Sequence, residues 1–344
     1  MLRSAGRALV GVAVAALTCS GAVACGSVTS TTSSLPPPTE LTKAVDALYD
    51  STGLTLTLRL DTTAARLQQL QGAQGGSKGH ALSDAQAHTL AGSAVVFAVT
   101  SGKGTLRQAS KDPAARGTEA FSLAVNAGGA PGVFEFRYVN KTLYARADAQ
   151  ALSSYSPGAL GKLGPAAGLL DGRWLSLPAQ TLSGLLGAAP GTPAPGPAPS
   201  AALPNALAQA FAHDVQVTRV GNGARGDHLV LTGSTRTIAR DLAGALSGRL
   251  GALPGGVGKM FDAAKVPDKV VHLDAYVQDG ALRSVSLDLA QFASGPDAAA
   301  LGNQPLRVEL DIARDAHIVV PPGATPLDLT KLLGSLGGLR HSAA

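Results

Sequence analysis

Three glycine-rich segments are spelled like catalytic or phosphate-binding motifs, but each lacks a feature that the chemistry requires. GGSKG at 75–79 fits the G-x-S-x-G nucleophile elbow, yet it lies in a polar, glutamine-rich stretch with no strand before it. GNGARG at 221–226 fits G-x-G-x-x-G, yet a strand is expected at 228–232, where a bound phosphate needs a helix N-terminus. GGVGK at 255–259 lacks the Ser or Thr that follows the lysine of a P-loop. We expect a flexible loop at the first segment and a hairpin turn at the second.

The histidines and cysteines form no metal-binding or nucleophilic motif. The seven histidines are scattered at positions 80, 88, 213, 228, 272, 317 and 341. The sequence contains no H-E-x-x-H, no paired cysteines and no S-x-x-K, which are signatures of zinc sites and of penicillin-binding enzymes. Nothing brings a nucleophile, a base and an orienting group together. The sequence therefore predicts a protein that is not an enzyme and that has no metal, nucleotide or redox cofactor.

The cysteine for which the sequence does predict chemistry is Cys25. Two arginines precede an uncharged run over 8–17, which has the length of a secretory signal and is too short to remain as a membrane span. Small residues precede the thiol in AVAC at 22–25, which looks like a bacterial lipobox, although Leu is usual at its first position. The sequence thus predicts a signal peptide over 1–24 and attachment of diacylglycerol to Cys25.

Two alternatives to this reading remain. Cys19 is a second thiol near the cleavage region, but Thr18 before it is branched and bulky for a signal peptidase. An ordinary signal peptide cleaved after Ala24 would release a soluble secreted protein.

Residues 25–38 are expected to form a lipidated flexible spacer, because they are uncharged, contain few apolar side chains and end in three prolines. The predicted location is the extracytoplasmic face of the cell membrane.

The charge of the chain bears on its partners, and its cysteine content bears on what stabilises its fold. The chain has 28 basic and 23 acidic residues, and two of the basic residues lie in the signal peptide. No basic block of the kind that follows a phosphate backbone occurs, so no nucleic-acid partner is predicted. Cleavage before Cys25 leaves one thiol and no possible internal disulfide. The mature chain, with a hydrophobic content of 45% over the full sequence, must be held by its core.

A proline-rich segment at 188–204, predicted to be an exposed loop, separates two regions of similar pattern. We expect sheet-and-helix regions over 39–187 and 205–337 that together form one continuous domain. The sequence does not identify a protein partner. In the first region a helix is expected at 39–50. Strands are expected at 54–60, 94–100, 119–126, 133–139 and 142–147.

The turn Asn140-Lys141 is expected to join two of these strands. A two-residue loop pairs Tyr138 with Leu143, so that the aromatic side chains of the hairpin share one face. The same loop pairs Phe136 with Ala145. Because lysine is a poor residue for a positive φ, the turn type stays open.

The second region is expected to have strands at 215–220, 228–232 and 306–312, helices over 235–250 and from Thr325, and a hairpin over 269–292. A two-residue Asp279-Gly280 turn would mix the two faces of that hairpin. A three-residue loop of Gln278, Asp279 and Gly280 keeps them separate, with Leu273 opposite Val285 and Val271 opposite Leu287. We predict the three-residue loop.

One-sided strands with a few amphipathic helices predict an α+β fold. The expected architecture is a curved antiparallel sheet, or half-barrel, with helices packed on its concave apolar face. Space for a ligand would lie between the sheet and the helices. Trp174, the single tryptophan, is expected to be a core residue, with a place in a binding site as the alternative.

Two short segments, VNKTLYAR at 139–146 and WLSLP at 174–178, carry a family resemblance. With the cysteine-anchored N-terminus, the spacer and a late prolyl turn, they resemble the LppX/LprG group of actinobacterial lipoproteins and, more distantly, the LolA-type carriers. The resemblance covers most of residues 40–336 in order of elements. It implies that the protein binds, stores or transfers a lipid or another hydrophobic ligand in an apolar cavity.

The cleanly alternating strands supply the side chains predicted to line that cavity. These candidates are Leu54, Leu56, Leu58, Leu60, Phe134, Phe136, Tyr138 and Leu143. If helices pack tightly on the sheet, the same side chains are ordinary core. A protein-interaction or structural lipoprotein of the cell envelope, with no ligand cavity, is therefore the alternative function.

Overall fold

The computed structural model describes residues 33–73, 82–112, 118–151, 171–179, 181, 215–237, 240, 268–292 and 306–327. The predicted signal peptide, Cys25 and the GGSKG and GGVGK segments lie outside these residues, as does most of the helix expected at 235–250. The predicted Pro-rich loop at 188–204 also lies outside them.

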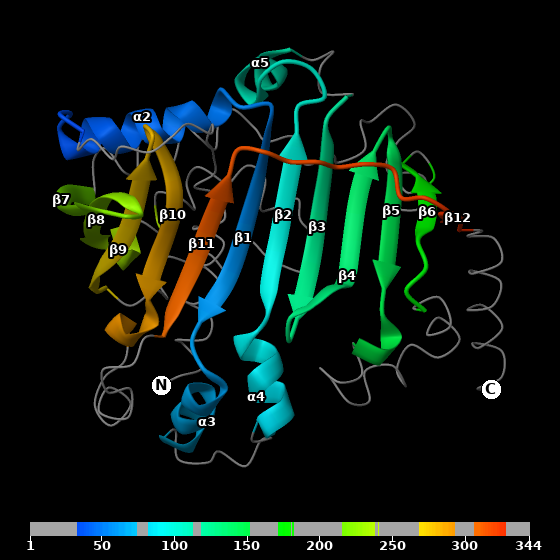
Figure 1. Ribbon diagram of the computed structural model, residues 1–344, viewed down its shortest axis with the longest axis horizontal. Coiled ribbons are helices and arrows are strands. Elements are labelled where there is room, and N and C mark those ends of the chain that lie inside the picture. The colour runs from blue at the N-terminus through cyan, green and yellow to red at the C-terminus, as the bar shows by residue number, and fades with distance from the viewer. Residues whose placement is uncertain are drawn as a thin grey trace.

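The described strands form one open sheet of twelve (Figure 1). The strands are β1 (Gly53–Asp61), β2 (Ala94–Thr100), β3 (Ala120–Ala127), β4 (Ala130–Val139), β5 (Thr142–Ala147), β6 (Leu175–Pro178), β7 (Val215–Gly223), β8 (Gly226–Ser234), β9 (Val270–Gln278), β10 (Ala281–Asp288), β11 (Arg307–Ala313) and β12 (Thr325–Pro326). Their order is β12-β6-β5-β4-β3-β2-β1-β11-β10-β9-β8-β7. The α+β class and the curved, unclosed antiparallel sheet are as the sequence predicts.

Two antiparallel meanders meet at the centre of this sheet. β1 to β6 run outward in one direction, whereas the chain from β7 to β11 runs inward from the opposite edge. β1 pairs with β11 over seven residues, from Thr55 opposite Ala313 to Asp61 opposite Arg307. Strands from both regions of the sequence therefore share one sheet.

The hairpin between β4 and β5 has the predicted register. Tyr138 lies opposite Leu143, and Phe136 lies opposite Ala145. Both turn residues have positive φ, 51° at Asn140 and 60° at Lys141, as a type I′ turn requires. With this turn the apolar side chains of both strands lie on one face.

The hairpin between β9 and β10 corrects the prediction of a three-residue loop. Gln278 pairs with Ala281 across a two-residue turn, and both turn residues, Asp279 and Gly280, have positive φ. The register then shifts between Leu282 and Ser284, so that one residue of β10 is bulged.

This bulge restores the separation of faces in a different register. Leu273 lies opposite Leu287, and Ala275 lies opposite Val285. The expected pairs of Leu273 with Val285 and of Val271 with Leu287 are therefore wrong. One extra residue moves all later side chains of the strand to the other face, whether it lies in the turn or as a bulge within the strand. The alternation of apolar residues is therefore the same for a three-residue loop and for a two-residue turn followed by a bulge, and it does not distinguish the two.

The helix α2 (Pro37–Tyr49) packs across β10 and β7 on one face of the sheet. It begins two residues before the expected Thr39, because prolines are accommodated in the first helical turn, where their missing N–H groups have no intrahelical partner. Leu41, Ala44 and Leu48 recur at helical spacing on its buried side. Burying each of the two leucines contributes roughly 1.5–3 kcal/mol.

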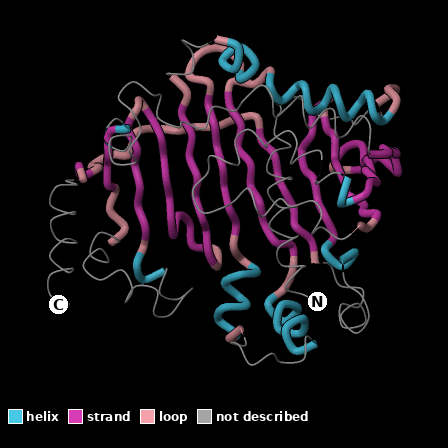
Figure 2. The backbone as a smooth tube through the Cα atoms, turned by 180° about the vertical axis from the view of Figure 1, so that it is seen from behind, coloured by secondary structure: helices cyan, strands magenta, loops and turns pink. Residues whose placement is uncertain are grey.

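The other described helices lie at the ends of the strands (Figures 1 and 2). They are α3 (Ala64–Ala73), α4 (Asp84–Ala91), α5 (Leu106–Lys111) and the 3-10 turn η5 (Leu289–Phe292). Capping boxes open two of them, from Ser83 with Gln86 in α4 and from Thr105 with Gln108 in α5. Among the described helices, α2 is thus the one that covers a face of the sheet.

A segment that we call the strap, residues 314–324, leaves β11 and crosses the sheet to β12 (Figure 1). Thr325 and Pro326 then pair in parallel with Leu175 and Ser176 of β6. The expectation that a helix starts at Thr325 is wrong at these two residues, because they complete the edge of the sheet. The leucines expected further along that helix lie outside the described residues.

Candidate functional site

The side chains predicted to line a cavity all lie on one face of the sheet, which we call the apolar face. The register places apolar side chains opposite one another from strand to strand. One row contains Ile312, Leu56, Phe97, Leu123, Phe136, Ala145 and Leu175. A second contains Leu54, Val99, Phe121, Tyr138, Leu143 and Leu177. A third contains Leu310, Leu58, Val95, Val125, Phe134 and Ala147.

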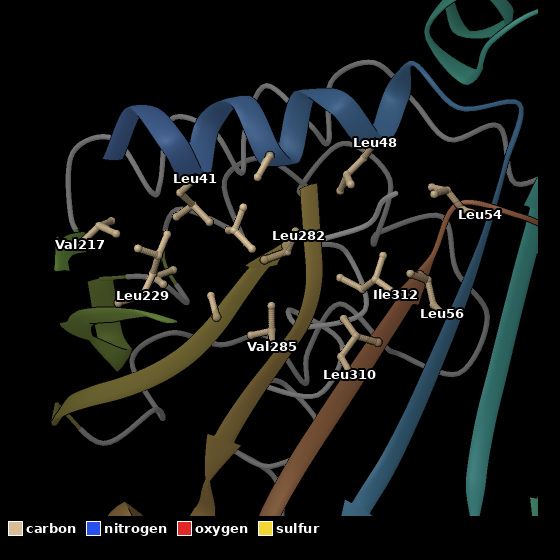
Figure 3. Packing of buried hydrophobic residues seen from close by; sticks show 14 of the residues in the cluster. Leu41, Leu48, Leu54, Leu56, Val217, Leu229, Leu282, Val285, Leu310 and Ile312 are labelled. Atoms are coloured by element: carbon tan, nitrogen blue, oxygen red, sulfur yellow. The ribbon is translucent and has the colours of Figure 1, made fainter. Parts of the chain in front are cut away.

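One end of the apolar face is closed by α2 (Figure 3). Leu41 and Leu48 of the helix belong to the same buried cluster as Leu229, Leu282 and Leu310 from the strands beneath. Leu229 and Leu310 have no exposed surface. This end of the face is an ordinary core.

Two of the predicted cavity residues belong to that core. Leu54 is 3% exposed and Leu56 is 1% exposed, and both join the cluster under α2. Leu58 is half-buried at the edge of the cluster, and Leu60 is half-buried beyond it. The alternation of β1 identifies one face correctly but does not distinguish its covered part from its open part.

Most of the rest of the apolar face, over β2 to β5, is half-buried, whereas Val99 and Ala147 are buried. Phe134, Phe136, Tyr138 and Leu143, which are predicted cavity residues, each keep a part of their surface accessible. No position in the three rows on these four strands carries a charge. We call this part of the sheet the open apolar strip.

Aromatic rings form the centre of the open apolar strip. The rings of Phe121 and Tyr138 stack with centroids 5.4 Å apart, and Phe121 and Phe136 lie 5.7 Å apart in a tilted arrangement. Phe121 is not among the side chains predicted for the cavity. A signal for it exists, since Phe121, Leu123 and Val125 alternate with smaller residues, Ser122, Ala124 and Asn126, along β3.

The opposite face of the same strands, the polar face, is closed by the strap. Arg137 donates a hydrogen bond from Nη1 to the carbonyl of Val319 at 3.0 Å, and the hydroxyl of Thr55 donates to the carbonyl of Asp315 at 2.6 Å. Ile318 of the strap packs against a small buried cluster that includes Tyr144. The strap therefore covers part of the polar side of β3 to β5.

Trp174 belongs to this polar side and not to the open apolar strip. The centroid of its ring lies 4.8 Å from the guanidinium of Arg137 and 5.0 Å from that of Arg146. Both arginines also form ion pairs with Glu135. Trp174 packs against the small cluster under the strap, which agrees with the expected core role.

A polar network covers the polar face near the centre of the sheet. Glu309 of β11 accepts hydrogen bonds from Arg59 at 2.9 Å and from Arg225 at 2.5 Å. Burial acts to raise the pKa of Glu309, but the hydrogen bonds from the two arginines outweigh it and hold that pKa below its usual value.

The same network extends to β8 and β9. The guanidinium of Arg225 lies 4.1 Å from the centroid of the Tyr276 ring, and this ring stacks on His228 with centroids 4.6 Å apart. His228 Nε2 is 2.7 Å from a carboxylate oxygen of Asp274. His228 is thus a paired side chain on the polar face.

Two expectations about motifs can be compared with the described residues. The GNGARG segment forms the turn between β7 and β8, as predicted, with Gly226 at a φ of +94°. Across the described part of the chain, no group of three or more His, Cys, Asp or Glu side chains is placed to hold a metal ion. In that same part, no helix combines the length and apolarity needed to cross a membrane.

A solved structure of similar fold is known. No family model matches the sequence, and no curated protein matches it. The crystal structure of the lipoprotein LppX of Mycobacterium tuberculosis is similar at 13% sequence identity. The match covers 82% of this chain and 96% of that chain, with a TM-score of 0.31.

Proposed function

We propose that this protein is a non-catalytic, lipid-anchored carrier that binds the alkyl part of a lipid or another hydrophobic ligand on the open apolar strip. The observation that supports this proposal is a difference in solvent exposure between two parts of the apolar face. Beneath α2 the apolar side chains are closed from solvent, whereas Phe134, Phe136 and Tyr138 remain half-buried. Contiguous apolar surface that keeps contact with solvent is typical of a binding site.

The strip matches an alkyl ligand in chemistry. Its side chains are aliphatic or aromatic, and the charged groups of β4 and β5, Glu135, Arg137 and Arg146, lie on the polar face. Burial of alkyl chain contributes about 0.8 kcal/mol per CH₂ group. Part of this gain is offset by the loss of translational and rotational freedom on binding.

The anchoring part of the proposal rests on the sequence. A signal peptide over 1–24 and a diacylglycerol on Cys25 would hold the protein on the extracytoplasmic face of the cell membrane. A lipid-binding face on a membrane-anchored protein would work close to a source of ligand.

Native mass spectrometry tests the binding part of the proposal. The chain from residue 26 onward, purified without detergent and delipidated, is mixed with a fluorescent fatty acid and measured for bound mass and for fluorescence. A stoichiometric adduct together with a rise in fluorescence is the expected result. A chain that keeps its fold and shows neither change contradicts the carrier function and favours a protein-interaction role.

A further inference from the structure

The chain between the predicted lipid anchor and α2 is fastened to one edge of the sheet. The backbone N–H of Ser33 donates to Asp227 of β8 at 2.9 Å, and Arg219 of β7 donates to the carbonyl of Leu35 at 2.9 Å. Arg219 also forms a close ion pair with Glu40 in the first turn of α2. We call these three contacts the clamp.

The clamp is protected from solvent. Glu40 is 4% exposed and Asp227 is 5% exposed, so both carboxylates lie below the surface, whereas the side chain of Arg219 is 22% exposed. Hydrogen bonds between ionised groups in such surroundings are stronger than those between exposed ones. Burial raises the pKa of Glu40, and the neighbouring Asp227 adds to this effect, while Arg219 opposes it.

The clamp shortens the free length of chain available to the anchor. Ser33 lies eight positions after Cys25, and eight residues can span at most about 28 Å. If residues 33–36 were released up to the start of α2, the reach of the chain would increase by about another 14 Å. The clamp therefore limits how far the β7–β8 edge can move from the lipid.

The sheet is wide compared with that reach. Its twelve strands, at a spacing of about 4.8 Å, extend over roughly 50 Å from β7 to β12. α2 starts near β7, whereas β6 and β12 lie at the opposite end of the sheet (Figure 1). A short tether at one end of a wide sheet restrains that end more than the other.

We propose that the clamp orients the anchored protein, with the β7–β8 edge of the sheet toward the phospholipid surface and the β4–β6 edge carried away from it. This inference rests on the lipidation of Cys25 in the proposed function and does not depend on ligand binding. The open apolar strip then lies on the half of the sheet distant from the protein's own anchor. Such an arrangement favours access to the strip by a ligand donor or acceptor above the membrane.

Two exposed valines allow the orientation to be measured. Val220 of β7 is 57% exposed, and Val320 of the strap is 45% exposed next to Val319, which accepts a hydrogen bond from β4. In the mature chain the thiol of Cys25 is consumed by lipid, so Val220→Cys or Val320→Cys supplies the free thiol for a fluorescent donor.

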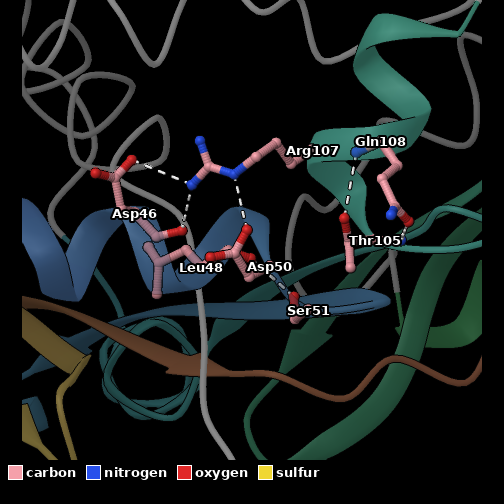
Figure 4. Close-up of polar contacts among 7 residues, drawn as sticks. All are labelled: Asp46, Leu48, Asp50, Ser51, Thr105, Arg107 and Gln108. Atoms are coloured by element: carbon pink, nitrogen blue, oxygen red, sulfur yellow. Dashed lines mark hydrogen bonds and ion pairs between the residues drawn. The ribbon is translucent and has the colours of Figure 1, made fainter.

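The experiment uses the full lipidated chain, reconstituted into phosphatidylcholine vesicles that contain a rhodamine-labelled lipid as acceptor. We expect greater energy transfer from position 220 than from position 320. Arg219→Leu should lower the transfer from position 220, because the longer free tether lets the edge move away. Arg107→Leu is the matched control, since Arg107 holds the other end of α2 through Asp46 and Asp50 (Figure 4).

The outcomes separate the orientation from the anchoring on which it rests. Equal transfer from both positions in the otherwise unchanged protein overturns the orientation, whether or not the Arg219→Leu protein folds. A loss of transfer from position 220 in Arg107→Leu as large as in Arg219→Leu also overturns the role of the clamp. A chain that remains in the aqueous fraction and has no lipid on Cys25 by mass spectrometry overturns the anchoring and, with it, the orientation.

Discussion

Ala145 and Ala275 lie on the same apolar face of one sheet, but only Ala275 is closed from solvent. Ala275 of β9 has no exposed surface and belongs to the cluster beneath α2. Ala145 of β5 is half-buried and lies opposite Phe136 in the open apolar strip. The pair therefore allows the same substitution to be made in the covered and the open part of the face.

Ala145→Trp is expected to reduce uptake of a fluorescent fatty acid while the free energy of unfolding changes little. The added ring would occupy surface that the ligand needs, and the half-open surroundings leave it room. Ala275→Trp should destabilise the protein by about 1–3 kcal/mol or more, because the added volume has no space in a closed core. Urea denaturation and a binding titration measure the two effects. A large loss of stability in both variants would mean that the strip is closed core as well.

Gly226→Ala is expected to destabilise the protein more than Gly280→Ala. Both glycines have positive φ, so both substitutions incur the strain of about 1 kcal/mol that this conformation imposes on other residues. A Cβ atom on Gly226 would also lie 2.2 Å from the carbonyl oxygen of Val277, whereas Gly280 has open space around it. Equal midpoints of urea unfolding for the two variants would contradict the close approach of β8 to β9.

Glu309 should make stability depend on pH in the acid range. Burial acts to raise its pKa, but hydrogen bonds from Arg59 and Arg225 lower it overall. A carboxyl group with a lowered pKa in the folded state contributes stability above its unfolded pKa, near 4.5, and this contribution is lost as the pH falls through the folded value. The difference in urea midpoint between the wild type and Glu309→Gln should therefore be present at pH 7 and shrink below pH ~4.5. A difference that stays constant with pH would exclude this linkage.

Cys25→Ser is expected to abolish lipid attachment without changing the folded domain. The substitution removes the predicted acceptor thiol, and the described residues begin at Ser33, beyond it. Metabolic labelling with an alkyne fatty acid should tag the wild type and not the variant, while far-ultraviolet circular dichroism of the domain stays the same. Label that persists on Cys25→Ser would assign the modification to another residue, with Cys19 the first to test.

The sequence by itself determined the positions of most strands and which side chains share a face. The bounds of β2 and β5 and the register across Asn140-Lys141 follow from alternation and turn length, which are local properties. The eight predicted cavity residues do lie on one face for the same reason. Alternation acts along a single strand, so it needs no knowledge of the rest of the chain.

Tertiary structure decided what covers that face and where the register shifts. Leu54 and Leu56 are core because α2 packs over them, and Leu143 is half-buried because it lies outside that contact, although all three alternate equally well. The bulge between Leu282 and Ser284 and the return of the strap to add β12 depend on partners far along the chain. Which distant segments come into contact depends on the total apolar area that the whole fold buries. The pattern of residues along one strand carries no information about that area.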